Sequence, residues 1–148
     1  MAAYSPLKNE PGGVELLPAL SASHEVWLPI TLPEGRMRWG KFTGELRTGP
    51  LGIGEPEGPG EPSLSGLSLD AVIVPALGVD RSGMRLGQGA GYYDRALLGV
   101  TCPVIALVYD EEIHDELPAE PHDRAVDAVV TQSGFMWLGT GLGGTAVQ

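Results

Sequence analysis

The stretch Arg85-Leu-Gly-Gln-Gly-Ala-Gly-Tyr-Tyr-Asp94 follows shortly after the apolar run of residues 71–74, which reads Ala-Val-Ile-Val. A short apolar run bounded by Pro and Gly is typical of a strand buried on both faces. Alternating glycines let successive backbone N–H groups turn toward one point, because no Cβ blocks the unusual backbone angles. A concave array of N–H donors with a helix beginning behind it is a typical phosphate site. The stretch therefore predicts a strand, a phosphate-binding loop and a helix in succession.

Glycine spacing by itself leaves an ordinary loop as the alternative. The chain contains 22 glycines in 148 residues, about twice the usual share. No Lys-Ser or Lys-Thr follows the last glycine, so the stretch is not a P-loop, and its spacing differs from the G-x-G-x-x-G of dinucleotide sites. The residues on either side of the glycines must therefore decide between a binding site and a loop.

The order of apolar runs along the chain indicates the fold class. Short apolar runs, typical of strands, cover residues 24–29, 70–75, 103–109 and 125–131. Residues 13–23 and 91–98 have the apolar spacing of helices. Strands that alternate with helical segments predict an α/β fold with a mostly parallel sheet. Proline and glycine crowd residues 50–66, which predicts a connecting loop, and the acid-rich residues 110–120 predict a solvated loop or a short helix.

The composition excludes several classes of protein. The chain has 9 basic and 19 acidic residues, which argues against a nucleic-acid partner. No segment approaches the ~20 apolar residues of a membrane span, and the first residues lack the basic and apolar regions of a signal peptide. The single cysteine, Cys102, excludes an internal disulfide and fits a reducing compartment. We therefore expect a cytoplasmic, monomeric protein in which Cys102 is a small buried residue.

An anion can bind to so acidic a chain only where the few basic residues converge. Four arginines lie in or beside the motifs that carry the chemistry, namely Arg81, Arg85, Arg95 and Arg124. We expect their guanidinium groups to supply the local positive charge that the net charge of the chain does not.

The string from Arg85 to Arg95 resembles the signature of the 5-formyltetrahydrofolate cyclo-ligase family, also called methenyltetrahydrofolate synthetases. Further segments match the family on both sides of this string: residues 4–11, 27–29, 52–56, 70–75, 78–80, 122–123 and 127–131. The resemblance covers nearly all of residues 2–132. It implies a single three-layer α/β domain over residues 1–133, in which helices flank a mostly parallel sheet. The Gly-rich residues 134–148 are expected to form a poorly ordered tail.

The resemblance also implies a role for each residue of the loop. The ATP contacts would come from Arg85, Leu86, Gly87, Gln88, Gly89, Ala90, Gly91, Tyr92 and Tyr93. The folate would contact Glu10, Gln88, Gly89, Ala90, Gly91 and Tyr92, and the catalytic residues would be Arg85 and Tyr92. Mg²⁺ would be held by Asp94 and Asp123. Taken without the family, Asp94 is better explained as a helix cap, and one tyrosine of the pair as a core residue.

The implied reaction is the ATP-dependent ring closure of 5-formyltetrahydrofolate to 5,10-methenyltetrahydrofolate. The formyl oxygen attacks the γ-phosphate, N10 of the folate closes on the activated carbon, and phosphate leaves. Such a reaction requires two substrates held in line and negative charge neutralised, which a glycine loop, an arginine and Mg²⁺ can supply. The chain therefore needs no nucleophilic side chain for this chemistry.

The chain departs from the family at its start. Family members carry a helical region before the first strand, with basic residues that contact ATP, whereas Lys8 is the only basic residue here before Arg36. A start codon assigned too late, which we favour, a shortened inactive relative, or a partner chain that completes the site would each explain this. The competing functions are a non-catalytic folate- or nucleotide-binding protein and, more remotely, a sugar-phosphate or CoA-handling enzyme of similar fold.

Overall fold

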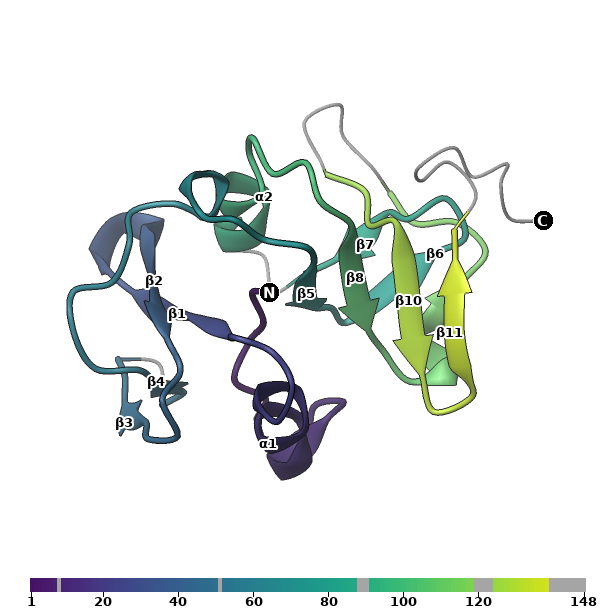
Figure 1. The fold of residues 1–148 in the computed structure, drawn as a ribbon. Helices are drawn as coiled ribbons and strands as arrows, with labels where there is room; N and C mark the ends of the chain where they lie inside the picture. Colours follow the sequence, from purple (N-terminus) through teal and green to yellow (C-terminus); the bar gives the residue numbers. More distant parts are fainter. Residues whose placement is uncertain (8, 51, 88–90, 119–123, 139–148) are drawn as a thin grey trace.

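The computed structural model describes residues 1–7, 9–50, 52–87, 91–118 and 124–138. Its main sheet has the strand order β11-β10-β8-β5 (Figure 1). Strands β5 (Val72–Pro75), β8 (Val104–Leu107) and β10 (Ala128–Thr131) are parallel, and β11 (Gly134–Trp137) pairs antiparallel with β10. The predicted runs 70–75, 103–109 and 125–131 contain the three parallel strands, so the mostly parallel character of this sheet is confirmed.

The start of the chain extends this sheet to a hairpin formed by β1 (Trp27–Thr31) and β2 (Met37–Lys41). Ala2 bridges Trp27 on one side and Val72 on the other, parallel to both. On the β5 side, the Ala2 N–H donates to the Ala71 carbonyl oxygen at 3.1 Å, and the Ile73 N–H donates to the Ala2 carbonyl oxygen at 2.9 Å. The first residues thus act as a short strand between β1 and β5.

Two apolar clusters cover the opposite faces of the sheet and define three layers. On one face, Val72, Val74 and Val104 pack with Leu97, which follows helix α2 (Tyr92–Ala96). On the other face, Ile73 and Leu107 pack with Leu17 of helix α1 (Leu16–Ser21). The three-layer α/β prediction is therefore confirmed, although both helices are short; α1 follows the 3-10 helix η1 (Gly13–Glu15).

A second, smaller sheet lies on the α2 side and carries the beginning of the predicted loop. Its strands are β6 (Gly78–Asp80), β7 (Arg85–Leu86) and β9 (Ile113–His114), in the order β7-β6-β9. Val79 of β6 belongs to the same apolar cluster as Val72 and Val104. Because β6 pairs antiparallel with β7, the residues between them form a tight turn that places Arg85 opposite Val79.

Asp80 holds this turn from inside the protein. The residue is 2% exposed, and its Oδ1 accepts hydrogen bonds from the Ser82 amide at 3.0 Å, the Ser82 hydroxyl at 2.8 Å and the Met84 amide at 2.9 Å. Its Oδ2 accepts one from the Leu117 amide at 2.9 Å. Burial by itself raises the pKa of a carboxyl group, but these hydrogen bonds outweigh it and hold the pKa of Asp80 below its usual value.

Two sequence predictions differ from the structure. The run 24–29 was expected to be a strand buried on both faces, but β1 begins at Trp27 and pairs antiparallel with β2, with alternating burial. The predicted poorly ordered tail begins at Gly134, but Gly134–Trp137 forms β11. The glycines of this segment suggested disorder, whereas Phe135, Met136 and Trp137 supply a strand that pairs with β10. Residues 139–148 lie outside the described residues.

The predicted connecting segments contain only short elements. Residues 50–66 hold the edge strand β4 (Gly54–Glu55), which pairs with β3 (Arg47–Thr48), and the 3-10 helix η3 (Leu64–Gly66). The acid-rich segment begins with the 3-10 helix η4 (Asp110–Glu112), and η2 (Pro33–Gly35) lies between β1 and β2. No helix within the described ranges is long and apolar enough to cross a membrane.

The turn between β6 and β7 predicts a specific cost for a side chain at Gly83. This glycine has φ +93°, and an added Cβ would fall on the carbonyl oxygen of Val126. Gly83→Ala should therefore lower the free energy of unfolding through backbone strain of about 1–3 kcal/mol and, in addition, through the displaced Val126–Gly83 hydrogen bond of 2.8 Å. Urea denaturation followed by circular dichroism measures the change.

Gly44→Ala is the matched control for this substitution. Gly44 has φ +103°, and nothing lies within 4 Å of the position of its Cβ. Both variants therefore carry a similar backbone strain, and only Gly83→Ala also displaces Val126. Equal destabilisation of the two variants would show that the contact with Val126 does not constrain the turn.

Candidate functional site

Arg85 is the buried centre of the residues predicted to bind ATP. Strand β7 turns its side chain, 7% exposed, back toward the end of β5. There Nη1 donates to the Pro75 carbonyl oxygen at 3.2 Å, and Nη2 lies 3.7 Å from Oδ1 of Asp94. A Cβ at Gly87 would lie 2.7 Å from Nη1, so glycine at this position leaves room for the guanidinium. The structure therefore places a positive charge directly beside the first glycine of the loop.

The two tyrosines of the motif have different surroundings. The Tyr93 ring lies 5.7 Å from the Arg85 guanidinium and packs edge-on against Trp39, with ring centroids 6.3 Å apart. Burial raises the pKa of Tyr93, although the positive charge of Arg85 opposes this. The Tyr92 ring instead lies 5.8 Å from the Arg95 guanidinium. Tyr93 thus joins the core, as one tyrosine of the pair was expected to do, and half-buried Tyr92 lies at its edge.

Arg95 fixes the beginning of α2 to the hairpin of β1 and β2. Its Nη2 donates to the Gly35 carbonyl oxygen at 3.1 Å, and the Arg95 amide donates to the Gly91 carbonyl oxygen at 3.2 Å. Gly91 precedes the helix in a left-handed conformation with φ 72°. This conformation favours glycine, so the last glycine of the loop is explained by backbone geometry.

Asp94 is exposed enough to reach a magnesium ion. Its side chain is 32% exposed and lies in the first turn of α2, beside Arg85. Gly91 occupies the N-cap position, and no side chain of a described residue makes a capping hydrogen bond there, so Asp94 is not the N-cap. Within the described residues, no three His, Cys, Asp or Glu side chains gather into a metal site. Mg²⁺ bound to phosphates needs only one or two carboxylates, so Asp94 fits this ion.

Two tyrosine hydroxyls hold the residues on either side of Glu10. On one side, the Tyr4 hydroxyl donates to the Pro11 carbonyl oxygen at 3.0 Å, and on the other the Tyr109 hydroxyl donates to the Asn9 carbonyl oxygen at 3.1 Å. After burial, the negative charge of Glu10 is the largest cause that raises the pKa of Tyr4, and it also acts on Tyr93. The charge of Glu10 is therefore near enough to act on both Tyr4 and Tyr93.

The other predicted residues lie outside the described part of the chain, are exposed, or form ion pairs away from the cluster. Gln88, Gly89, Ala90, His122 and Asp123 lie outside the described residues, and Leu86 is an exposed residue of β7. Arg81 pairs with Asp115 at 3.5 Å, and Arg124 pairs with Asp127 at 3.4 Å. Of the four arginines expected to supply positive charge, the structure brings Arg85 and Arg95 to the loop. The other two are matched with carboxylates of their own.

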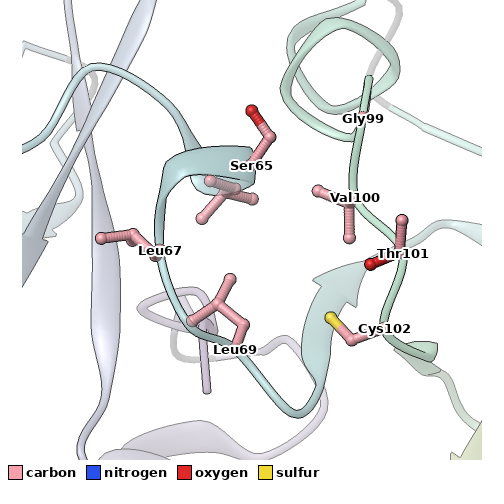
Figure 2. A pocket seen from close by; sticks show the side chains of 8 residues that line it. Ser65, Leu67, Leu69, Gly99, Val100, Thr101 and Cys102 are labelled. Carbon is pink, nitrogen blue, oxygen red and sulfur yellow. The ribbon is translucent and has the colours of Figure 1, made fainter.

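Cys102 lines a small cavity away from this cluster, between η3 and the segment after α2 (Figure 2). The cavity measures about 40 Å³, far below the roughly 300–1,000 Å³ of a ligand site. Cys102 is half-buried rather than fully buried, and burial raises the pKa of its thiol. Since the thiolate is the nucleophile, this environment agrees with the predicted packing role.

The sequence predicts no role for Tyr4, Tyr109 or Asp80. For Asp80 a local signal does exist, because Asp80-Arg-Ser-Gly83 is a recognisable turn in which the aspartate binds its own backbone. No local signal could have identified Tyr4 and Tyr109, because their carbonyl partners depend on the tertiary fold.

Comparison with known proteins agrees with this arrangement. The model of the 5-formyltetrahydrofolate cyclo-ligase family matches residues 1–132. A protein of Mycolicibacterium smegmatis named 5-formyltetrahydrofolate cyclo-ligase is 43% identical over 140 residues, which cover 88% of this chain and 72% of that protein. The protein of the same name from Escherichia coli is 34% identical over 120 residues, which cover 76% of this chain and 65% of that protein.

Two solved structures have the same fold. The NMR structure of Aquifex aeolicus 5,10-methenyltetrahydrofolate synthetase matches with a TM-score of 0.76 and 31% identity, over 95% of this chain and 72% of that chain. A 5,10-methenyltetrahydrofolate synthetase from Mycoplasma pneumoniae matches with a TM-score of 0.59 and 25% identity, over 86% of this chain and 70% of that chain. With the match over residues 1–132, these likenesses show that the chain belongs to the 5-formyltetrahydrofolate cyclo-ligase family.

Proposed function

We propose that this protein converts 5-formyltetrahydrofolate to 5,10-methenyltetrahydrofolate in a reaction that consumes ATP and requires Mg²⁺. The observation that carries the proposal is the cluster of the buried Arg85 guanidinium with Tyr93 and Asp94, beside Gly87 and Gly91. It combines a desolvated cation, a partly exposed carboxylate and a backbone that can approach a ligand closely. Membership in the family of cyclo-ligases supports the same reaction.

Each residue has a task that its chemistry permits. The backbone amides of residues 86–91 and the Arg85 guanidinium contact the phosphates of ATP, since charge-assisted hydrogen bonds to phosphate are among the strongest in proteins. Glu10 and Tyr92 contact the folate and orient its formyl group toward the γ-phosphate. Asp94, together with Asp123, holds Mg²⁺, which neutralises charge on the phosphate oxygens when it is bound.

Non-catalytic binding of folate or nucleotide is the second candidate. The chain spans 72% of the Mycolicibacterium protein and 65% of the Escherichia coli protein. Contacts made by the unmatched parts of those proteins would be needed for turnover under this candidate. It predicts binding of 5-formyltetrahydrofolate without consumption of ATP.

The first experiment measures formation of the methenyl product by absorbance, with the Mycolicibacterium relative as the positive control. We expect the 148-residue chain to form product only when ATP and Mg²⁺ are both present. Folate binding in a titration without any product would replace the proposal by the second candidate. Absence of both binding and product, while the relative is active, would contradict both candidates.

Asp94→Asn should weaken the dependence on magnesium. An amide lacks the charge of the carboxylate, so the Mg²⁺ concentration for half-maximal activity should rise about 10–100-fold, as for other losses at metal sites. Titration of activity with Mg²⁺ at saturating ATP measures this shift. Asp115→Asn is the matched control, because Asp115 is a fully solvent-facing carboxylate, 98% exposed. An unchanged magnesium midpoint in Asp94→Asn would remove Asp94 from the metal site.

Gly87→Val should weaken the use of ATP through Arg85. The new side chain would enter the space of the Arg85 guanidinium, 2.7 Å from the position of the Cβ. Loss of one charge-assisted phosphate contact corresponds to roughly a 10–100-fold higher KM for ATP, with a smaller effect on the KM for folate. Gly66→Val, at a glycine whose Cβ would make only ordinary contact at 3.6 Å, is the control. Equal KM values for ATP in the two variants would contradict the role of Arg85.

A further inference from the structure

Asp80 is a deeply buried carboxylate that the proposed reaction does not use. Four donors converge on it, three from the turn between β6 and β7 and one from Leu117. The turn donors are the Ser82 amide and hydroxyl and the Met84 amide, and all three bind Oδ1. A carboxylate can accept bonds at both oxygens, whereas an asparagine in its place would present a single acceptor oxygen. Both oxygens of the Asp80 carboxylate therefore accept hydrogen bonds, three from backbone amides and one from the Ser82 hydroxyl.

The hydrogen bonds to Oδ1 fix the backbone position from which the Arg85 side chain extends. Met84 directly precedes Arg85, and the Asp80 amide donates to the Met84 carbonyl oxygen at 2.9 Å in addition to the bond from the Met84 amide to the carboxylate. Asp80 therefore closes the turn through its backbone and its side chain together. Arg85 then pairs with Val79 across the two strands. From this position its guanidinium reaches both Pro75 and Asp94.

The bond to Oδ2 ties the same turn to a distant part of the chain. Leu117 follows β9, which is parallel to β6, with Asp80 opposite His114. On the other side of the turn, the Val126 amide donates to the Gly83 carbonyl oxygen at 2.8 Å. The turn is thereby held between two segments, so it cannot shift without breaking bonds in both.

We propose that Asp80 is a positioning residue for the phosphate-binding loop, acting through the β6–β7 turn to hold the Arg85 guanidinium beside Gly87 and Asp94. It touches neither substrate nor metal in this proposal. The inference rests on the proposed function, because Arg85 must contact ATP for its position to matter. It goes beyond that function by extending the nucleotide site to a residue inside the protein.

Asp80→Asn is the decisive substitution, because it keeps the size of the side chain and one acceptor oxygen. We expect the variant to bind a non-hydrolysable ATP analogue with Mg²⁺ roughly tenfold more weakly, as for loss of one charged hydrogen-bond contact. Binding of 5-formyltetrahydrofolate should change less than about threefold, because Arg85 contacts ATP and not the folate in the proposed site. Isothermal titration calorimetry well below the thermal midpoint measures both. Glu116→Gln, a change of an exposed side chain on the segment between β9 and Leu117, should leave both affinities unchanged.

A double-mutant cycle tests whether Asp80 acts through Arg85. In an Arg85→Ala background, Asp80→Asn should produce less than about a twofold further loss of ATP affinity, because the group that it positions is already absent. A full additional tenfold loss would overturn the proposal, as would equal losses of ATP and folate affinity in the single variant. Either result would assign Asp80 a purely structural role.

Hydrogen exchange keeps this test separate from the proposed function. Asp80→Asn should speed exchange of the amides of Met84 and Leu117 more than that of amides in β8, whether or not nucleotide binds. Unchanged exchange at both positions would overturn the positioning role by itself. If exchange rises as expected but the unsubstituted chain binds no ATP analogue, the proposed function fails and the link from Asp80 to nucleotide binding fails with it, while the hold on the turn stands.

Discussion

The architecture depends on the short strand of residues 1–3, which occupies the gap between β1 and β5. Neighbouring residues of a strand point to opposite faces of a sheet, and here Ala2 belongs to the apolar cluster under α2 while Ala3 belongs to the cluster under α1. Both residues are fully buried. Without this strand, the β1–β2 hairpin and the parallel strands would be separate sheets, and neither cluster would be continuous. The same segment continues to Tyr4, whose hydroxyl donates to the carbonyl oxygen of Pro11, the residue after Glu10.

The candidate site lies where four separate parts of the chain meet. The end of β5 supplies a carbonyl oxygen to Arg85, β7 supplies Arg85 itself, α2 supplies Tyr93 and Asp94, and the β1–β2 hairpin reaches the site through Trp39 and Gly35. Ligands of open α/β sheets bind beyond the carboxyl ends of the strands, and the end of β5 is such a position. The positive charge here is not a surface patch. It is one buried guanidinium and a second at the rim, each fixed by carbonyl oxygens and aromatic rings.

Sequence reasoning identified the parallel strands and the motif helix because their signals are local. Residues 70–75 and 103–109 are short apolar runs, the first ending and the second beginning with proline, and the motif helix begins directly after the left-handed Gly91. The run 24–29 was wrongly predicted to be buried on both faces, because an apolar run does not show how many of its faces the tertiary fold covers; β1 has alternating burial. Strand β11 was missed because the glycine content of residues 134–148 as a whole suggested disorder, although the segment begins with the strand-forming Gly-Phe-Met-Trp. The positions of Arg81 and Arg124 could not be derived, because nearness in sequence does not fix which carboxylate an arginine meets.

An acidic chain that binds two anionic substrates must keep its cations available at one place. The net charge of −10 repels anions at long range, but salt screens this repulsion beyond about 10 Å. A buried guanidinium attracts an anion at contact distance, where the surrounding medium is less polar and the attraction is stronger. Arg85 is such a guanidinium. Its side chain is buried, the Tyr93 ring packs against it, and its charged neighbour Asp94 is partly exposed. Burial of a charge costs free energy unless hydrogen-bond and ion-pair partners are held in place around it. Asp80 and Gly83 fix the backbone that carries Arg85, so affinity for an anion in this protein is built from the turn before the loop as much as from the loop itself.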